Sequence, residues 1–305
     1  MRSKGEEKAE SQQSAEKSGS TEWPSVGLGV YFVAYFYATI CLLLVVYADS
    51  DYGQWKRKIT LLHALLALEF PSLLISLKVY WAMRGREKAG VPKRRPELSG
   101  VMFSLLSYIP RSCVLWFSFG LIWDWQSVGL ASRLNASTVF VVGGMLGLLY
   151  RYGWAWVAWK ISDQETPEFD THMYATYRMH LPRGKVAQWL LAVQTVVISP
   201  FFEELVYRGF LVFFLASLFP NAGSHGLGAV VGLTLCLLVH IYQGLASLKS
   251  HLLAFLIYLV LLYSPLGLLG VIAFHMSCNL FFQVNFYHWW RWHLPQMRSR
   301  RVRAE

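Results

Sequence analysis

The stretch ISPFFEELVYRG, residues 198–209, places three charged side chains inside a long apolar segment. These are Glu203, Glu204 and Arg208, and the apolar residues around them run from about 187 to 217. A run of this length can cross a bilayer. Ionisable side chains within a bilayer cost about 2.5–3.5 kcal/mol each on insertion scales, so they face a cavity or a partner and usually carry function. The stretch therefore predicts a membrane helix that holds a functional site.

The composition is that of a membrane protein. The chain has 305 residues, of which 55% are hydrophobic and 15% are charged. Soluble domains carry about 25% charged residues. The net charge is +10, but the basic residues lie mainly in connections between apolar runs, where they suit the positive-inside rule and anionic lipid head groups. We therefore expect an all-α polytopic membrane protein that contacts membrane lipid and binds no nucleic acid.

Taking roughly 20 apolar residues as one crossing predicts about eight membrane helices. They cover residues 26–47, 59–82, 100–123, 137–159, 187–217, 226–246, 251–264 and 266–287. Pro200 is a natural bending point in the fifth, and Ser264-Pro265 marks the turn after the seventh. Most Lys and Arg residues fall in connections on one side, which places both termini in the cytoplasm.

The chain divides into four parts by composition and motif. Residues 1–25 are expected to be a disordered cytoplasmic tail, because they are polar and charged. Residues 26–184 are expected to hold transmembrane helices without an assignable motif, 185–287 to form a membrane core that carries the candidate catalytic residues, and 288–305 to be a basic cytoplasmic tail. The loop 160–186 is most simply solvated, with an amphipathic substrate-entry element as the alternative. A prokaryotic plasma (inner) membrane is expected, with the endoplasmic reticulum membrane as the alternative.

The positions of the two adjacent glutamates on a helix indicate different roles for them. Glu204 and Arg208 are an i, i+4 pair on one helix face, with the acid first, as electrostatics prefer. Glu203 lies about 100° around the helix from Glu204, so it is free to face a cavity. There it could take a proton from water as a general base. The alternative is that the cluster is a structural polar lock between helices.

Three further polar residues in later apolar runs could complete a hydrolytic site. His240 could help Glu203 to position and deprotonate a water, although an isolated histidine at a helix end is also a common capping residue. His275 and Asn279 lie one turn apart on one face, so both can aim at one point. Their N–H groups are suitable donors for an oxyanion. The alternative is an interhelical hydrogen-bond pair.

Other hydrolytic chemistries find less support. No G-x-S-x-G occurs, and Ser199 and Ser277 have no adjacent histidine in sequence. The H-E-x-x-H zinc pattern is also absent. A scattered zinc site of Glu203, His240 and His275 stays open, because two histidines and one glutamate form a known catalytic set. We rank a metal-free carboxylate mechanism above it, and we expect no metal and no cofactor.

With these residues in view, about residues 185–287 resemble the CAAX-protease and bacteriocin-processing (CPBP or Abi) family of intramembrane glutamic endopeptidases, similar to the type II CAAX prenyl endopeptidase. Three motifs occur in the family's order: E-E-x-x-x-R as Glu203, Glu204 and Arg208, an F-x-x-x-H position ending at His240, and H-x-x-x-N as His275 and Asn279. One position departs, because the family's usual Phe is Cys236 here.

The resemblance implies a metal-independent glutamate peptidase. In that interpretation Glu203, aided by His240, activates water. His275 and Asn279 then form the oxyanion hole. The substrate would be a peptide or a lipidated protein, since eukaryotic and archaeal members of the family trim the last three residues from prenylated C-a-a-X proteins.

The resemblance also implies that Glu204 and Arg208 order the site. Bacterial members are more varied, and some act in peptide maturation or immunity, or as scaffolds without shown proteolysis. A catalytically silent scaffold or bacteriocin-immunity factor of the same fold is therefore an alternative. A proton- or substrate-coupled transporter is another, although the inverted repeats expected of one are not found in the sequence. The oligomeric state is left open.

Overall fold

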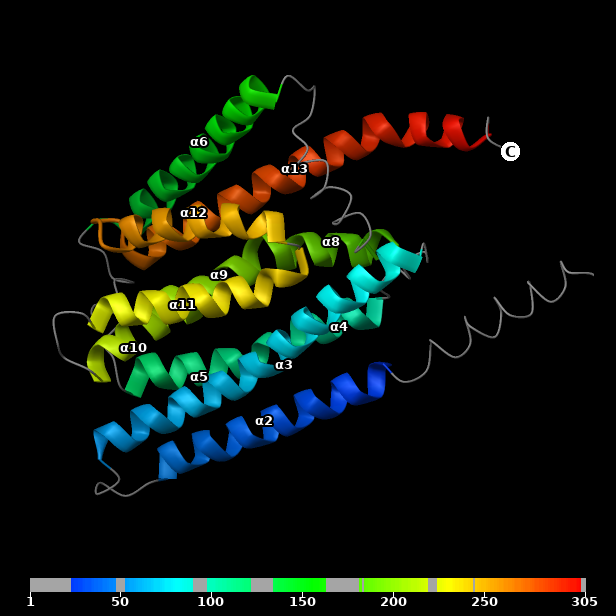
Figure 1. The fold of residues 1–305 in the computed structure, drawn as a ribbon. Coiled ribbons are helices and arrows are strands. Elements are labelled where there is room, and N and C mark those ends of the chain that lie inside the picture. Colours follow the sequence, from blue (N-terminus) through cyan, green and yellow to red (C-terminus); the bar gives the residue numbers. More distant parts are fainter. Residues whose placement is uncertain are drawn as a thin grey trace, which may run out of the picture. The chain divides into compact units, whose positions relative to one another are not determined.

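The computed structural model describes residues 23–47, 53–89, 98–121, 134–162, 181–182, 184–218, 224–243 and 245–302. Every regular element within these residues is a helix (Figure 1), which confirms the predicted all-α fold class for them. In chain order the helices are α2 (Trp23–Tyr47), α3 (Gln54–Ala89), α4 (Leu98–Leu106), α5 (Tyr108–Leu121), α6 (Ala136–Ser162), α8 (Lys185–Val193), η2 (Gln194–Ile198), α9 (Ser199–Glu204), η3 (Leu205–Phe210), α10 (Leu211–Leu218), α11 (Ser224–His240), η4 (Ile241–Gln243), α12 (Leu245–Leu262) and α13 (Gly267–Val302). The predicted tail 1–25 falls almost wholly outside the described residues, and most of the predicted loop 160–186 does so too.

Several of these helices have the character of membrane spans. By length and composition, Val30–Tyr47, Lys185–Ala216 and Gly267–Tyr287 are long and apolar enough to cross a bilayer. They coincide with the first, fifth and eighth predicted spans. Two shorter apolar helices, His225–His240 and His251–Leu262, overlap the sixth and seventh. The total of eight spans and the cytoplasmic position of both termini stay predictions.

The chain forms two compact units, Met1–Ile75 and Ser76–Glu305. The first unit contains α2 and the beginning of α3. Along α2 the buried side chains recur every three or four residues: Ala34, Ala38, Cys41 and Val45. One face of this helix is therefore buried, while large apolar residues remain exposed on the rest of it, as suits a helix in lipid. All candidate site residues belong to the second unit, which is the one described below.

The predicted third span is divided into two helices, α4 and α5, which meet at Ser107. Pro110 causes the break, because it has no N–H to donate to the preceding turn. The Ser107 hydroxyl donates to the Ser104 carbonyl oxygen at 2.6 Å, and Arg111 Nη1 donates to the Ser107 carbonyl and hydroxyl oxygens at 3.2 and 3.0 Å. The break makes Tyr108 the first residue of α5.

The helix that carries both glutamates runs without interruption from Lys185 to Leu218, through α8, η2, α9, η3 and α10. Its geometry changes twice, because the wider π-helical segments η2 and η3 lie on either side of α9. Pro200 cannot donate a backbone hydrogen bond, and just before it the Ser199 N–H bonds back five residues to the Gln194 carbonyl. The bend predicted at Pro200 thus takes the form of a change in helical register. Such segments are frequent at functional sites.

Helix α6 packs closely against α13 through small residues. A Cβ atom added to Gly143 would lie 2.5 Å from the Gly270 carbonyl oxygen, and one added to Gly147 would overlap the Phe274 carbonyl oxygen. The Cys278 thiol also donates to the Gly147 carbonyl oxygen at 3.6 Å. Glycines that let two backbones touch are typical of membrane helix pairs. The sequence analysis did not identify this pair of glycines.

Gly147→Ala is therefore expected to destabilise the protein, because α6 and α13 must separate to admit the methyl group. Overpacking of this kind typically costs about 1–3 kcal/mol. Gly153→Ala on the same helix is the matched control, since a Cβ there would meet nothing within 4 Å. Thermal unfolding of the purified variants in detergent is the measurement. Equal midpoints for the two variants would contradict the close packing.

The predicted end of the sixth span at 246 is wrong. Helix α11 ends at His240, η4 follows, and the next helix, α12, already begins at Leu245. A short 3₁₀ turn is a common way for a helix to end, and Gly244, which follows it in sequence, is the residue type that most often lies beyond a helix end. His240 is therefore the last residue of its helix. The predicted turn at Ser264-Pro265 is confirmed, since α12 ends at Leu262 and α13 begins at Gly267.

Candidate active site

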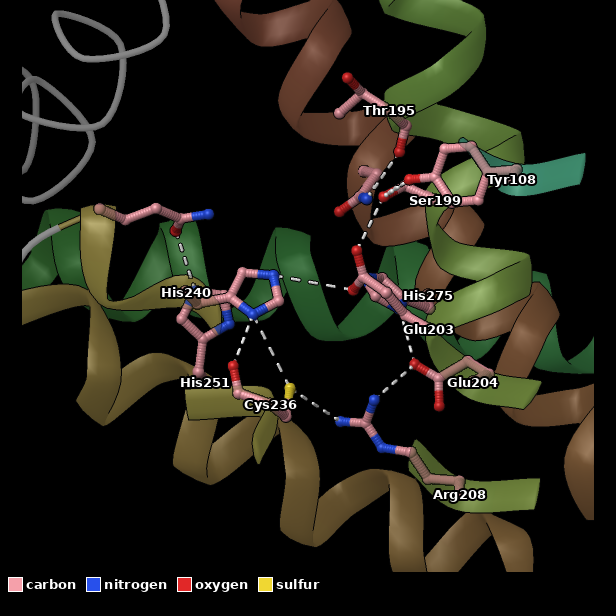
Figure 2. Close-up of polar contacts among 12 residues, drawn as sticks. Tyr108, Thr195, Ser199, Glu203, Glu204, Arg208, Cys236, His240, His251 and His275 are labelled. Atoms are coloured by element: carbon pink, nitrogen blue, oxygen red, sulfur yellow. Dashed lines mark hydrogen bonds and ion pairs between the residues drawn. The ribbon is translucent and has the colours of Figure 1, made fainter. Parts of the chain in front are cut away.

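Glu203 is the centre of a polar cluster within the second unit (Figure 2). Its Oε1 accepts a hydrogen bond from the Ser199 hydroxyl at 2.8 Å, and its Oε2 lies 3.7 Å from His240 Nε2. The Glu203 side chain is 21% exposed, and that of His240 is 11% exposed. Glu203 therefore remains accessible to a small molecule such as water, while both of its oxygens already face polar groups.

Glu204 forms the buried half of the cluster. Its Oε1 accepts from Arg208 Nη1 at 3.1 Å and from His275 Nδ1 at 2.7 Å. The side chains of Glu204 and Arg208 are 0% and 2% exposed. The predicted i, i+4 ion pair is thus present, and it lies one residue along the helix from Glu203. Glu204 on α9 contacts both Arg208 on η3 and His275 on α13, so it links two of the three helices that carry the motifs.

Arg208 has aromatic rings on its free faces. The guanidinium carbon lies 4.4 Å from the Phe255 ring centre and 4.7 Å from that of Tyr258. The Tyr258 ring also stacks on His275, with 5.3 Å between ring centres. Cation–π contacts partly replace the hydration that a buried guanidinium loses. Helix α12 therefore supports the ion pair, a contribution that the sequence analysis did not anticipate.

The backbone fixes the orientation of His240. Its Nδ1–H donates to the Cys236 carbonyl oxygen at 2.7 Å, which turns Nε2 toward Glu203. Cys236 stands where the family usually has Phe, and its thiol lies 3.9 Å from both His240 Nδ1 and Arg208 Nη2. Since the carbonyl rather than the side chain holds the histidine, the departure from the family motif leaves the imidazole orientation intact.

A second imidazole lies against His240. The His251 ring centre is 4.5 Å from that of His240 (Figure 2). His251 Nε2 donates to the Gln243 Oε1 at 2.9 Å. Sequence reasoning missed His251, which it placed only at the start of a span. The signal available in the sequence was the presence of two histidines, His240 and His251, in apolar helices on either side of a short connection.

His275 and Asn279 have separate partners. His275 Nδ1 donates to Glu204, so its Nε2 is a donor only when the ring is protonated on both nitrogens. Asn279 Nδ2 donates to the Thr195 carbonyl oxygen at 2.9 Å. In a π-helical turn, the N–H of each residue donates to the carbonyl five residues earlier. Residue 200 would therefore donate to the Thr195 carbonyl, but Pro200 has no N–H. Asn279 thereby satisfies a backbone group that the proline leaves open.

The N-terminal half also reaches the site. The Tyr108 hydroxyl on α5 is 3.0 Å from the Ser199 hydroxyl, and the Tyr108 ring lies 5.0 Å from that of Phe202. One turn earlier, Gln194 Nε2 donates to the Ser104 hydroxyl on α4 at 2.6 Å. No motif marks Tyr108 in the sequence. The local sign was a tyrosine two residues before a proline in the middle of an apolar run.

The alternative zinc site finds no geometric support. Within the described ranges, no three His, Cys, Asp or Glu side chains converge as metal ligands do. Glu203 and His240 face each other, whereas His275 is directed to Glu204. The three residues proposed as ligands therefore do not share one centre.

A family comparison covers the part of the chain that carries these residues. Residues 185–281 match the model of the family described as type II CAAX prenyl endopeptidase Rce1-like. This confirms the resemblance to the CAAX-protease family over that segment. All six motif residues lie within the match, whereas Tyr108 lies outside it. No curated protein and no solved structure matches the chain significantly. Residues 185–281 are therefore similar to a family of membrane-embedded proteases, and the apolar helices suit a membrane protein.

Proposed function

We propose that the protein is a metal-independent intramembrane endopeptidase in which Glu203 and His240 activate a water. The observation that supports this most directly is the 3.7 Å between Glu203 Oε2 and His240 Nε2. This distance is too long for a direct hydrogen bond. With His240 Nδ1 donating to a carbonyl, neutral His240 has a lone pair on Nε2. Two acceptors that face each other in this way suit a water that donates to both.

The reaction follows from this arrangement. Glu203 takes one proton from the water while His240 accepts the other hydrogen bond and orients the oxygen. The oxygen forms a bond to the scissile carbonyl carbon, and the carbonyl oxygen becomes an oxyanion. Collapse of this intermediate breaks the C–N bond, and the proton held by Glu203 passes to the leaving amine. Water is consumed, and Glu203 returns to its starting state.

The oxyanion needs donors, and α13 carries them. With both ring nitrogens protonated, His275 keeps its Nδ1–H bond to Glu204 and donates from Nε2. Asn279 uses one of its two amide hydrogens for the Thr195 carbonyl and retains the other. Glu204 and Arg208 order the site by holding His275 in place.

The substrate proposed is a peptide or protein cleaved near its C-terminus, including a prenylated C-a-a-X protein held by the surrounding lipid. Both termini and the opening of the site would face the cytoplasm. The membrane would be a prokaryotic plasma membrane or, as the alternative, that of the endoplasmic reticulum. Family membership over residues 185–281 supports the reaction class.

The test is cleavage of a fluorogenic farnesylated C-a-a-X peptide by the full chain in liposomes, with mass spectrometry of the products. The unprenylated peptide and a zinc chelator are parallel arms. Release of the C-terminal tripeptide, unchanged by chelator, is the expected result. Loss of turnover with chelator would overturn the metal-independent mechanism. If neither peptide is cleaved, a scaffold role becomes the better hypothesis, and pH-driven flux in the same liposomes would favour a transporter.

A further inference from the structure

Glu203 is connected by hydroxyl groups to a helix outside the family match. The Ser199 hydroxyl donates to Glu203 Oε1 at 2.8 Å. With its hydrogen used in this way, Ser199 is the acceptor in its 3.0 Å contact with the Tyr108 hydroxyl. The chain of donors therefore runs from Tyr108 through Ser199 to the carboxylate, and both links are drawn in Figure 2.

Tyr108 is itself held from several sides. Its ring lies against Phe202, which is next to Glu203 on α9, and the Arg111 guanidinium carbon lies 5.5 Å from the centre of that ring. The α4–α5 break at Ser107 sets the position of Tyr108, because it starts a new helix there. A rigid phenol can fix the rotor of a serine hydroxyl, which by itself can turn among several directions.

We propose that Tyr108 and Ser199 are positioning residues for Glu203. They hold Oε1 so that Oε2 faces His240 and the water between them. The N-terminal half, which has no recognisable motif, thereby contributes one arm of the catalytic site. The inference rests on the proposed function. A competing interpretation makes Ser199 a nucleophile with Glu203 as its base, since the two side chains are in hydrogen-bond contact.

The experiment compares Tyr108→Phe, Ser199→Ala, Ser199→Thr and the Tyr108→Phe/Ser199→Ala double variant with wild type in the liposome assay. We expect kcat to fall about tenfold in the first two variants with KM unchanged, because the arrangement matters to the transition state more than to binding. The double variant should lose no more than Ser199→Ala, since Tyr108 acts through Ser199. Ser199→Thr keeps the hydroxyl and should restore most of kcat.

Tyr150→Phe is the matched control. The Tyr150 ring packs on Phe274, with 5.6 Å between ring centres, much as the Tyr108 ring packs on Phe202. Unlike that of Tyr108, the Tyr150 hydroxyl has no hydrogen bond among the described residues. Tyr150→Phe should keep wild-type kcat. Unchanged kcat in Tyr108→Phe, or a rise in KM alone, would overturn the proposal. So would complete loss in Ser199→Ala with labelling of wild-type Ser199 by a fluorophosphonate, which would establish the nucleophile instead.

A spectroscopic measurement that needs no peptide cleavage tests the hydroxyl chain independently of the proposed peptidase activity. The Glu203 carboxylate stretch can be assigned by the infrared difference between wild type and Glu203→Gln. It should shift in both Tyr108→Phe and Ser199→Ala, even if no peptide is cleaved. A band that moves in neither variant would overturn the hydroxyl chain.

An independent observation concerns Arg151 on α6. Its Nε is buried without a hydrogen-bond partner, and no acidic partner of its side chain is found in the described part of the chain. It lies one turn beyond Gly147, whose carbonyl oxygen accepts from the Cys278 thiol on α13, and Cys278 is three residues from His275. A cation in an apolar helix that has no acidic partner among the described residues is a candidate for binding an anionic ligand.

We infer that Arg151 binds the terminal carboxylate of the peptide substrate. A site that cleaves close to a C-terminus meets a full negative charge a few residues beyond the scissile bond. Guanidinium is suited to a carboxylate because it offers paired donors in one plane. This inference also rests on the proposed function, since it names the feature by which the same site would select chain ends.

The test uses two peptides that differ only in a C-terminal carboxylate or carboxamide. Wild type should cleave the carboxylate peptide with a kcat/KM about tenfold higher or more, and Arg151→Gln should remove that preference. Lys160→Gln, which removes an exposed cation from the same helix, should keep it. An Arg151→Gln variant that retains the preference, or loses activity equally on both peptides, would overturn the inference. Binding of the labelled peptides to Glu203→Gln gives the same comparison without turnover.

Discussion

Glu203→Gln should lower kcat on the C-a-a-X peptide by about 10²- to 10⁴-fold, the range typical of losing a general base. The amide has the same shape and can still accept a hydrogen bond from Ser199, so the surrounding contacts remain. It cannot take a proton from water. KM should change little, because the carboxylate acts on the water and not on the bound peptide.

The measurement for this variant combines initial rates with a thermal unfolding curve. An unfolding midpoint near that of wild type would show that the lost activity is chemical. The proposed mechanism would be contradicted by a Glu203→Gln variant with more than about a tenth of wild-type kcat. If wild type has a biological phenotype that this variant leaves intact, the scaffold hypothesis gains instead.

Arg208→Met should cause the largest loss of stability. The substitution removes the cation that pairs with Glu204, whose side chain is fully buried, and leaves the carboxylate with His275 as its remaining partner. Breaking a buried ion pair from one side typically costs about 3–5 kcal/mol. The aromatic faces of Phe255 and Tyr258 would lose their cation as well. Thermal unfolding in detergent and limited proteolysis both measure the effect.

The double variant Glu204→Gln/Arg208→Met separates the structural role from the catalytic one. Removing both charges should recover part of the stability lost by Arg208→Met, since no unpaired buried charge remains. Activity should stay low, because a neutral amide is a weaker acceptor than a carboxylate for the His275 Nδ1–H and holds the ring less firmly. Full recovery of kcat together with stability would show that the ion pair has no part in catalysis. An Arg208→Met variant as stable as wild type would contradict the structural role.

The features that local sequence encodes were predicted well. Glu204 and Arg208 pair because an i, i+4 spacing brings side chains together on any helix, although the intervening turns are π-helical. The turn at Ser264-Pro265 was predicted from residue type alone and is confirmed. The end of α11 was placed too late, because hydropathy continues through Ile241 while the backbone already turns. A run of apolar residues reports burial more reliably than it reports where a helix ends.

Contacts between distant segments could not be predicted in this way. Tyr108 and Ser199 are 91 residues apart, and Asn279 and Thr195 are 84 apart. No periodicity links such positions, and a tyrosine in an apolar run is ordinarily a packing or interfacial residue. The expectation that His275 and Asn279 aim at one point rested on their shared helix face. The structure gives them different partners, since Glu204 and the Thr195 carbonyl lie at different heights along α9 and η2.

By itself the sequence determined that this is a helical membrane protein with charged residues inside its apolar segments, and the order of its motifs pointed to the CAAX-protease family. Those properties depend on composition and on spacing within single helices. Only the tertiary structure decided which groups surround each glutamate. It turned Glu203 toward Ser199 and His240 and Glu204 toward Arg208 and His275, because neighbouring residues on a helix point about 100° apart and therefore meet different helices.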